Sequence, residues 1–273
     1  MNKKVYFLSD VHLGSAAHKK LLNEQELTEI ASKGLDINYY ARHKIERRLC
    51  AWLDMAKKDA KAIYLLGDIF DYWFEYKNVI PRGCVRFLGK IAEITDSGIE
   101  VHFFIGNHDI WLTDYLEKEC NLIIHREQFV TEIYGKKFFL AHGDGLGDDS
   151  LSFRLLRKLF HSKACRVPFA AIHPRWTVGF AYWWSNHNRA TGTDPAYMGE
   201  DKEHLVLFAK EEIKKTPDIN FFIFGHRHIM LDLMLSATSR VSILGDWLSY
   251  FSYGVFDGDN FTLEVYEEDT TTN

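Results

Sequence analysis

Near its start the chain reads VYFLSDVHLG (residues 5–14), a short apolar run that leads into a D-x-H pair. Such a run, stopped by Ser9 and Asp10, is typical of a buried strand that ends in a polar loop. The same succession of strand and polar motif returns four more times. These motifs are Gly67-Asp68-Ile69-Phe70-Asp71, Gly106-Asn107-His108-Asp109, His142-Gly143-Asp144 and Gly225-His226-Arg227-His228. Because ligands of open α/β sheets bind beyond the carboxyl ends of the strands, we expect the five motifs to converge.

The strands that carry these motifs predict an α/β protein. In the first half, apolar strands are expected at 4–8, 62–66 and 101–105, with helices at 35–58 and 82–94 between them. Continuous apolar strands separated by helices indicate a parallel sheet covered on both faces. From residue 128 onward the strands are shorter, which predicts a second, more mixed sheet. They are expected at 129–133, 137–141, 221–224, 230–235, 241–244, 250–256 and 261–266.

Composition excludes several classes of protein. The chain has 273 residues, of which 47% are hydrophobic, so it is not disordered and can bury a sizeable core. Its net charge of −5 argues against a general nucleic-acid-binding protein, which is usually basic. The first apolar run is too short for a signal peptide, and four scattered cysteines are typical of a reducing compartment. We therefore expect a cytoplasmic protein.

The motifs offer carboxylates, one amide carbonyl and imidazoles, but no thiolate. The candidate ligands are Asp10, His12, Asp68, Asn107, His142, His226 and His228. Such donors suit Mn, Fe, Zn, Ni or Co and argue against a structural zinc site. Seven ligands are too many for one octahedral ion and fit two ions that share a carboxylate, as in two-metal phosphoryl transfer. In the D-x-H and H-x-H pairs, an extended backbone would place both side chains on one side.

The order D-x-H, G-D-x-x-D, G-N-H-D, H-G-D, G-H-x-H resembles that of the calcineurin-like metallophosphoesterase superfamily over nearly the whole chain. The resemblance implies an α/β/β/α sandwich of two mixed sheets flanked by helices. It also implies two divalent metal ions, with Mn²⁺ preferred and Fe²⁺, Zn²⁺, Ni²⁺ or Co²⁺ as alternatives. The implied ligands are Asp10, His12 and His228 for one ion, Asn107, His142 and His226 for the other, and Asp68 as the bridge. His108 would act beside the scissile phosphate as a donor or general acid, oriented by Asp109.

Four blocks are more particular: SDVHLG (9–14), GDIFDYW (67–73), HGDGL (142–146) and LGDW (244–247). They are similar to the UDP-2,3-diacylglucosamine diphosphatases of lipid A biosynthesis. This resemblance implies hydrolysis of UDP-2,3-diacylglucosamine to UMP and 2,3-diacylglucosamine 1-phosphate by a metal-bridging hydroxide. The chain departs from that family at His108, where members have Arg, and at Arg227, where they have Thr. The alternatives are another calcineurin-like phosphodiesterase, acting on a nucleotide, a sugar diphosphate or a nucleic acid, and an inert metal-binding protein.

Residues 150–193 differ in composition from the rest, with seven basic and eight aromatic residues and no Asp or Glu. We expect them to form a helical cap inserted into a metallophosphoesterase domain of residues 1–149 and 194–266, followed by a flexible tail, 267–273. Such a cap suits a lipid-linked nucleotide sugar and peripheral contact with the cytoplasmic face of the inner membrane; the alternative is a helical pair with a solvated basic face. By resemblance, the substrate pocket includes Asp149, Ser185 and Arg189. No stable nucleic-acid partner is expected.

Overall fold

The computed structural model of the chain describes residues 3–147, 159–160, 162–191 and 197–268. Its helices are η1 (Ala16–Leu21), α1 (Glu24–Ser32), α2 (Ile37–Lys57), α3 (Val85–Asp96), α4 (Tyr115–Cys120), α6 (Lys163–Ala171), α7 (Pro174–Thr191) and α8 (His204–Lys215). Its strands are β1 (Lys4–Leu8), β2 (Ala60–Leu65), β3 (Glu100–Phe104), β4 (Ile123–His125), β5 (Phe129–Ile133), β6 (Lys136–Ala141), β7 (Ile219–Phe224), β8 (Met230–Met234), β9 (Arg240–Leu244), β10 (Ser252–Phe256) and β11 (Phe261–Val265).

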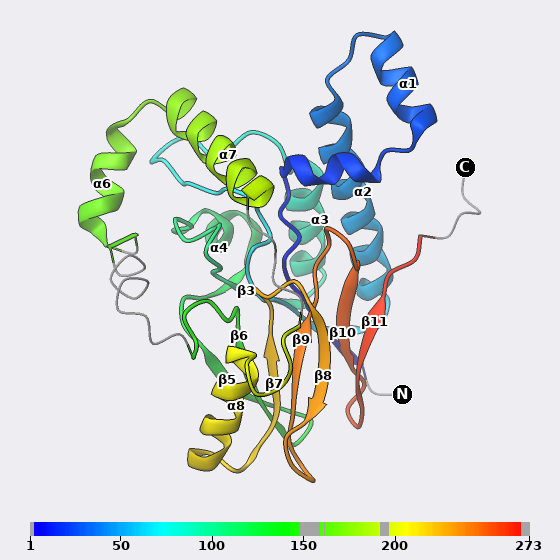
Figure 1. Cartoon of the computed structure of the whole chain (residues 1–273), viewed down its shortest axis with the longest axis vertical. Helices are drawn as coiled ribbons and strands as arrows, with labels where there is room; N and C mark the ends of the chain where they lie inside the picture. The colour runs from blue at the N-terminus through cyan, green and yellow to red at the C-terminus, as the bar shows by residue number, and fades with distance from the viewer. Residues whose placement is uncertain (1–2, 148–158, 161, 192–196, 269–273) are drawn as a thin grey trace.

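The expected α/β/β/α sandwich is confirmed (Figure 1). One sheet has six strands in the order β11-β10-β1-β2-β3-β4, and the other has five in the order β5-β6-β7-β9-β8. Helices α2 and α3 pack on the outer face of the first sheet, and α8 packs on the outer face of the second. Both sheets mix parallel and antiparallel pairs.

The inward and outward faces of β1 show why its sequence is apolar throughout. Val5 and Phe7 point into the core between the two sheets, where Phe7 stacks on Phe138. Tyr6 and Leu8 point the other way, into the core under the helices, where Tyr6 meets Trp52 edge-on. Because successive side chains of a strand alternate between its faces, a strand buried on both sides reads as a continuous apolar run.

The last two strands differ from the prediction. The change of rhythm after residue 128 assigns them to the second sheet, but β10 pairs antiparallel with β1, and β11 pairs with β10. The physical reason is that β10 is buried at all five positions. Its Val255 lies in the core under the helices and its Phe256 lies in the core between the sheets, so its pattern suits either sheet.

Helices α6 and α7 stand to one side of the sandwich (Figure 1). They contact it through aromatic side chains. The Phe169 ring lies 5.0 Å from that of Phe74 and 4.5 Å from that of Trp111, measured between ring centroids. The Tyr76 hydroxyl hydrogen-bonds the buried Thr177 hydroxyl. These helices belong to the expected cap, whose boundaries stay a prediction. Within the described ranges, every helix is too short or too polar to cross a bilayer.

Candidate metal centre

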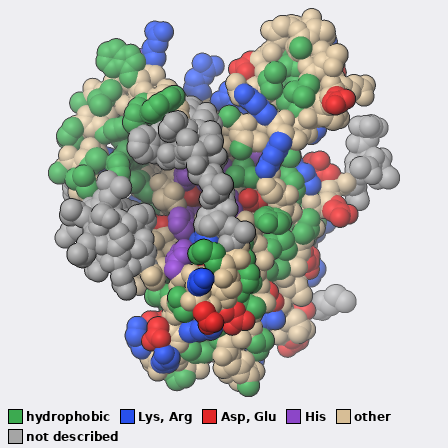
Figure 2. Space-filling model, in the orientation of Figure 1, with side chains coloured by type: hydrophobic (Ala, Val, Ile, Leu, Met, Phe, Trp, Pro, Cys, Tyr) green, Lys and Arg blue, Asp and Glu red, His purple; other side chains and the backbone are tan. Residues whose placement is uncertain are grey.

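The structure brings the five motifs together at one end of the sandwich, where β1, β2 and β3 of one sheet and β6 and β7 of the other end. Backbone hydrogen bonds tie the loops to one another. The Asp10 N–H donates to the Gly67 carbonyl (3.1 Å), and the Gly225 N–H donates to the His142 carbonyl (2.9 Å). The His226 N–H donates to Asp10 Oδ2 (2.8 Å), which joins segments more than two hundred residues apart in sequence. Figure 2 shows histidine side chains, in purple, near the middle of the view.

Several motif residues adopt a left-handed backbone conformation, which non-glycine residues rarely do. They are Asp10 (φ 54°), His12 (φ 51°), Asp68 (φ 53°), His226 (φ 68°) and His228 (φ 52°). The expectation that the D-x-H and H-x-H pairs are extended is therefore wrong. Because both residues of each pair turn into this conformation after their strand has ended, the side chains converge by backbone curvature rather than by strand alternation. Such strain persists where surrounding contacts enforce it, commonly at functional sites.

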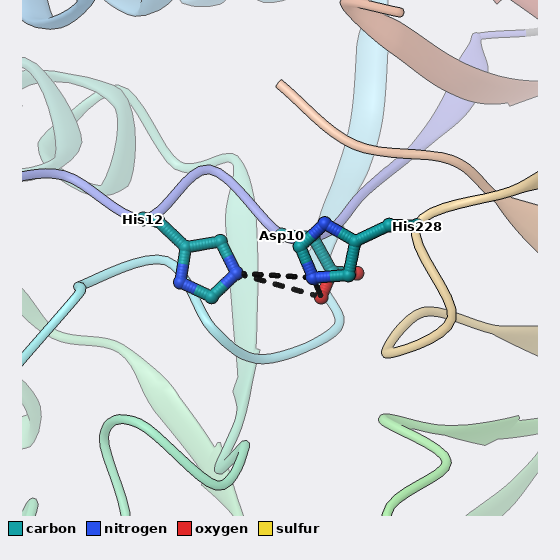
Figure 3. Close-up of side chains that lie close together, drawn as sticks. All are labelled: Asp10, His12 and His228. Atoms are coloured by element: carbon teal, nitrogen blue, oxygen red, sulfur yellow. Dashed lines mark hydrogen bonds and ion pairs between the residues drawn. The ribbon is translucent and has the colours of Figure 1, made fainter. Parts of the chain in front are cut away.

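The first cluster consists of Asp10, His12 and His228, whose side chains point toward one another (Figure 3). The two Nε2 atoms of the histidines lie 3.3 Å apart, and Asp10 Oδ1 lies 3.5 Å from His228 Nε2. Asp10 Oδ2 accepts hydrogen bonds from the His226 N–H and the Ser9 hydroxyl. In the described part of the chain, Oδ1 accepts none, although Asp10 is completely buried.

The second cluster consists of Asp68, His142 and His226, with Asn107 beside it. His142 Nε2 lies 3.4 Å from Asp68 Oδ2 and 3.2 Å from Asn107 Oδ1. The His226 ring meets the His142 ring edge-on, with centroids 5.1 Å apart. His142 Nδ1 contacts the Leu66 carbonyl at 2.8 Å, so Nδ1 carries the proton and Nε2 faces the cluster.

Asp68, a member of the second cluster, also faces His12 of the first. Its Oδ2 is 3.4 Å from His142 Nε2 in one and 3.9 Å from His12 Nε2 in the other. Burial alone would raise the pKa of Asp68, but the neighbouring His142 and His108 hold it well below its usual range. A charged carboxylate facing both clusters is the arrangement that a bridging ligand requires.

Glycines let these groups approach one another. Gly67 has φ +87°, and a Cβ there would lie 2.7 Å from His142 Nδ1. A Cβ on Gly106 would collide with the Asp68 carboxylate. A side chain at either position would therefore displace a candidate ligand.

The donors of the two clusters fit divalent metal ions. All are carboxylate oxygens or imidazole nitrogens, which first-row metals prefer, and no thiolate is among them. The buried Asp10 Oδ1 is the clearest sign, because a buried carboxylate oxygen without a hydrogen-bond donor is costly unless a cation compensates it. The two closely facing Nε2 atoms of His12 and His228 likewise suit two lone pairs directed at one ion.

Asp246, in the LGDW block, is a further candidate residue of the site, for which the sequence alone predicted no role. Its Oδ2 lies 3.1 Å from His228 Nδ1. Its Oδ1 accepts hydrogen bonds from three backbone N–H groups, those of Leu248, Ser249 and Tyr250. A carboxylate fixed in this way orients the imidazole and makes its other nitrogen a better metal ligand. The only sequence signal for it was an Asp directly after an apolar strand and a glycine.

His108 stands at the rim of the first cluster. Its ring meets the His12 ring edge-on at 4.7 Å between centroids, and about a quarter of its side chain is exposed. Its Nδ1 lies 2.9 Å from the Asp71 carbonyl, which can only accept, so Nδ1 carries the proton. Nε2 is then an acceptor in the neutral ring and a donor in the imidazolium.

Asp109 is completely buried beneath the loop that carries His108. Its carboxylate accepts from the backbone N–H groups of Gly106 (2.7 Å) and Ile69 (3.1 Å). Burial and the nearby Asp68 charge raise the pKa of Asp109 to about 7. The contact to the His108 ring is made by the Asp71 carbonyl instead, so the expectation that Asp109 orients this ring stays a prediction.

The residues expected to contact substrate are not placed by the structure. Asp149 lies outside the described residues, and the side chains of Ser185 and Arg189 on α7 lie outside the described part as well. Arg227, between the last two histidines, is placed: its Nε and Nη2 donate to the two oxygens of the buried Glu203, at 2.8 and 3.1 Å. This bidentate pair holds the loop of His226 and His228 against the start of α8.

Comparisons with known proteins agree with this geometry. The family model of calcineurin-like phosphoesterases matches residues 3–230. The UDP-2,3-diacylglucosamine hydrolase of Porphyromonas gingivalis is 43% identical, over 98% of this chain and 99% of the relative. The enzyme of that name from Neisseria meningitidis serogroup A is 26% identical, over 97% and 99%. Among solved structures, the phosphoesterase Yfce from E. coli is 15% identical and covers 96% of this chain and 92% of its own. Its TM-score of 0.41 is too low to support an argument.

Proposed function

The chain belongs to the calcineurin-like phosphoesterase family, and from this premise we propose that it hydrolyses UDP-2,3-diacylglucosamine to UMP and 2,3-diacylglucosamine 1-phosphate. The observation that supports this substrate is the likeness to the P. gingivalis relative, which bears the name of that activity and aligns from end to end. We further propose that Asp10, His12 and His228 hold one divalent ion. Asn107, His142 and His226 would hold the second, with Asp68 shared.

Two divalent ions at this site would supply a water molecule that ionises near neutral pH and positive charge against the phosphate oxygens. The protein's own contribution is to hold the ligands still. The Asp246 carboxylate fixes the His228 ring, the Leu66 carbonyl fixes that of His142, and Asp10 Oδ2 fixes the backbone of His226. Ligands that need no rearrangement add no reorganisation cost when charge develops on the phosphate.

His108 is placed to assist at the open side of this centre. Because its Nδ1–H donates to the Asp71 carbonyl, its Nε2 can donate to a phosphate oxygen only when the ring is cationic. We therefore propose that His108 acts as an imidazolium, stabilising negative charge on the phosphate or protonating the leaving group. Asp109 would hold the loop of His108 in place by accepting hydrogen bonds from the backbone N–H groups of Gly106 and Ile69.

The cap helices supply surfaces that suit the acyl chains and the membrane. On α7, Trp176, Phe180 and Trp183 are 70%, 54% and 58% exposed. Arg175 directly precedes Trp176 on the same helix, and exposed aromatic and cationic side chains together suit the boundary between acyl chains and anionic head groups. We propose that the cap receives the diacyl end of the substrate and contacts the cytoplasmic face of the inner membrane peripherally.

Phosphorus NMR of the products tests the proposal. Metal-stripped protein is reloaded with Mn²⁺ and given UDP-2,3-diacylglucosamine, beside an Asp68→Ala variant and an Asp259→Ala control in the exposed β10–β11 turn. We expect UMP and a sugar 1-phosphate from the parent and the control, and neither from Asp68→Ala. Metal content per chain, measured by elemental analysis with Mn²⁺, Fe²⁺, Zn²⁺, Ni²⁺ or Co²⁺ offered in turn, identifies the metals that bind.

Two other outcomes would redirect the assignment. Metal-dependent cleavage of a simple phosphodiester without turnover of the lipid would keep the chemistry and discard the substrate. The alternatives are then a nucleotide, a sugar diphosphate or a nucleic acid. Metal binding without any hydrolysis would contradict the proposal altogether.

A further inference from the structure

A cavity borders the segment that leaves the candidate metal centre after His12. It is a cavity of about 330 Å³, bounded by the loop that follows His12, the first turns of α2 and the segment before α3. Its lining includes Leu13 and Gly14, the two residues directly after His12. Two residues of chain span at most about 7 Å, so this part of the lining lies within about 7 Å of the backbone of His12, a candidate metal ligand. Its volume is at the lower end of the range for small-molecule sites.

The position of the cavity relative to the cap matters because the proposed substrate is a linear molecule. The cap contacts loops after β2 and β3, through Phe74, Tyr76 and Trp111. The cavity borders the loop after β1 and, at Arg82, the far end of the loop after β2, just before α3. In Figure 1 the cap helices α6 and α7 stand on one side of the strand ends, and helix α1 and the start of α2 stand on the other. A substrate cleaved at its central diphosphate, with its acyl end under the cap, would extend its nucleoside end away from the cap, toward the side on which α2 lies.

The chemistry of the lining suits a nucleoside. Arg42 and Arg82 line the cavity, and in the described part of the chain neither forms an ion pair with a carboxylate. The Arg42 Nε donates to the Asn38 carbonyl at 3.2 Å, which leaves its terminal nitrogens available. Tyr39, which is 53% exposed, supplies an aromatic surface of the kind on which bases stack.

The one carboxylate in the lining is already engaged. Glu46 Oε1 accepts from the N–H groups of Arg86 and Phe87 at the start of α3. Its Oε2 lies 3.4 Å from His43 Nδ1. The charged groups left to meet a ligand are therefore guanidinium groups, which only donate hydrogen bonds. Uracil and cytosine differ at position 4, where uracil has a carbonyl that can accept from a guanidinium and cytosine has an amino group that cannot, so an arginine that reaches this position favours uracil.

We infer that this cavity binds the uridine end of the nucleotide sugar, with Arg42 and Arg82 donating to the base and Tyr39 stacking on it. The inference rests on the proposed function, because it assigns the second half of the same substrate. It gives the first turns of α2, a helix that the sequence predicts at 35–58, a role in substrate selection.

Inhibition by nucleotides tests this inference on the full-length, Mn²⁺-loaded protein. UMP, CMP and ribose 5-phosphate are compared as competitive inhibitors of the hydrolysis of a small chromogenic phosphodiester. All three offer a phosphate to the metals, but only UMP offers uracil. We expect UMP to bind about tenfold more tightly than ribose 5-phosphate, and more tightly than CMP. Equal inhibition by all three would overturn the inference.

Variants locate the binding surface. Arg42→Ala and Arg82→Ala should each raise the inhibition constant of UMP about tenfold and leave that of ribose 5-phosphate unchanged. Arg47→Ala, on the same helix but outside the cavity, should change neither. Unaltered turnover of the chromogenic ester shows that each variant is folded. If the Arg42 and Arg82 variants bind UMP as the parent does, the cavity is not the nucleoside site.

The lipid substrate separates this failure from that of the proposed function. If the parent cleaves UDP-2,3-diacylglucosamine and the KM of the Arg42→Ala and Arg82→Ala variants is unchanged, only the cavity assignment is wrong. If the parent does not cleave the lipid but binds UMP through Arg42 and Arg82, the nucleoside site stands and the acyl-sugar half of the substrate must be replaced.

Discussion

At the metal centre the functional side chains are buried, whereas on the cap helices the large apolar side chains are exposed. Asp10, His12 and Asp68 are each at most 2% exposed, and backbone hydrogen bonds join the loops that carry them. Trp176 and Trp183 on α7 are more than half exposed. The two regions meet through a small aromatic contact, in which Phe169 packs against Phe74 and Trp111.

This difference indicates that the two regions have different roles, one in the chemistry at the phosphate and the other in the choice of substrate. A buried, strained site whose loops are joined by hydrogen bonds would hold ions and a phosphate in one geometry, which every phosphoester substrate needs. An exposed aromatic surface gains free energy only when something apolar covers it, so it selects substrates by what they carry beside the phosphate. Changes at the metal centre should therefore affect every substrate, and changes on the cap only those with acyl chains.

The largest effect is expected from loss of a candidate ligand. His12→Ala removes one of the two facing Nε2 atoms of the first cluster, so the metal content should fall from about two ions to about one per chain. Turnover of both the lipid and a small phosphodiester should fall about a thousandfold. The control is His125→Ala at the edge of the first sheet, which should keep its metal and its activity. A His12→Ala variant that still binds both ions would contradict the ligand assignment.

A smaller effect is expected when a ligand stays but its support changes. In Asp246→Asn the side-chain oxygen can still accept from the three backbone N–H groups, but the amide nitrogen cannot accept from His228 Nδ1. The fold should survive, and the concentration of Mn²⁺ that restores half of the activity should rise about tenfold to a hundredfold. Activity at saturating Mn²⁺ should recover on both substrates. An unchanged Mn²⁺ requirement would mean that His228 does not depend on Asp246.

The same comparison explains how much the sequence could reveal. The sandwich was predictable because five strands are largely buried on both faces and each ends in a motif of polar residues; they are β1, β2, β3, β6 and β7. The convergence of the seven candidate ligands followed from that placement. The curvature that brings Asp10 and His12 together was not predictable, because left-handed conformations at non-glycine residues are imposed by the surrounding loops. Nor was Asp246, whose role depends on β10 returning beside β1.

The cap was predictable only as a composition. Its lack of acidic residues and its aromatic content distinguish it from the rest of the chain. Helices were expected there, and α6 and α7 lie within it. Which aromatic residues dock and which face solvent could not be read from spacing alone. Phe169 contacts the sandwich, whereas Trp176, five residues after Ala171 and on the next helix, faces outward. That distinction depends on the turn between α6 and α7 and on the Tyr76–Thr177 hydrogen bond.

The smallest effect, and the sharpest test of these different roles, is expected on the cap. The double variant Trp176→Ser, Trp183→Ser should lower turnover of UDP-2,3-diacylglucosamine in mixed micelles about tenfold. The reason is that it loses two exposed apolar side chains whose transfer from water to the lipid would favour binding. Hydrolysis of a small chromogenic phosphodiester should stay within about twofold of the parent, because neither side chain belongs to the candidate ligand set. Met234→Ser on β8, where the side chain is also 58% exposed, is the matched control and should leave both rates unchanged. Equal losses on the two substrates would mean that the cap shapes the metal centre itself, so that the two regions form one functional unit.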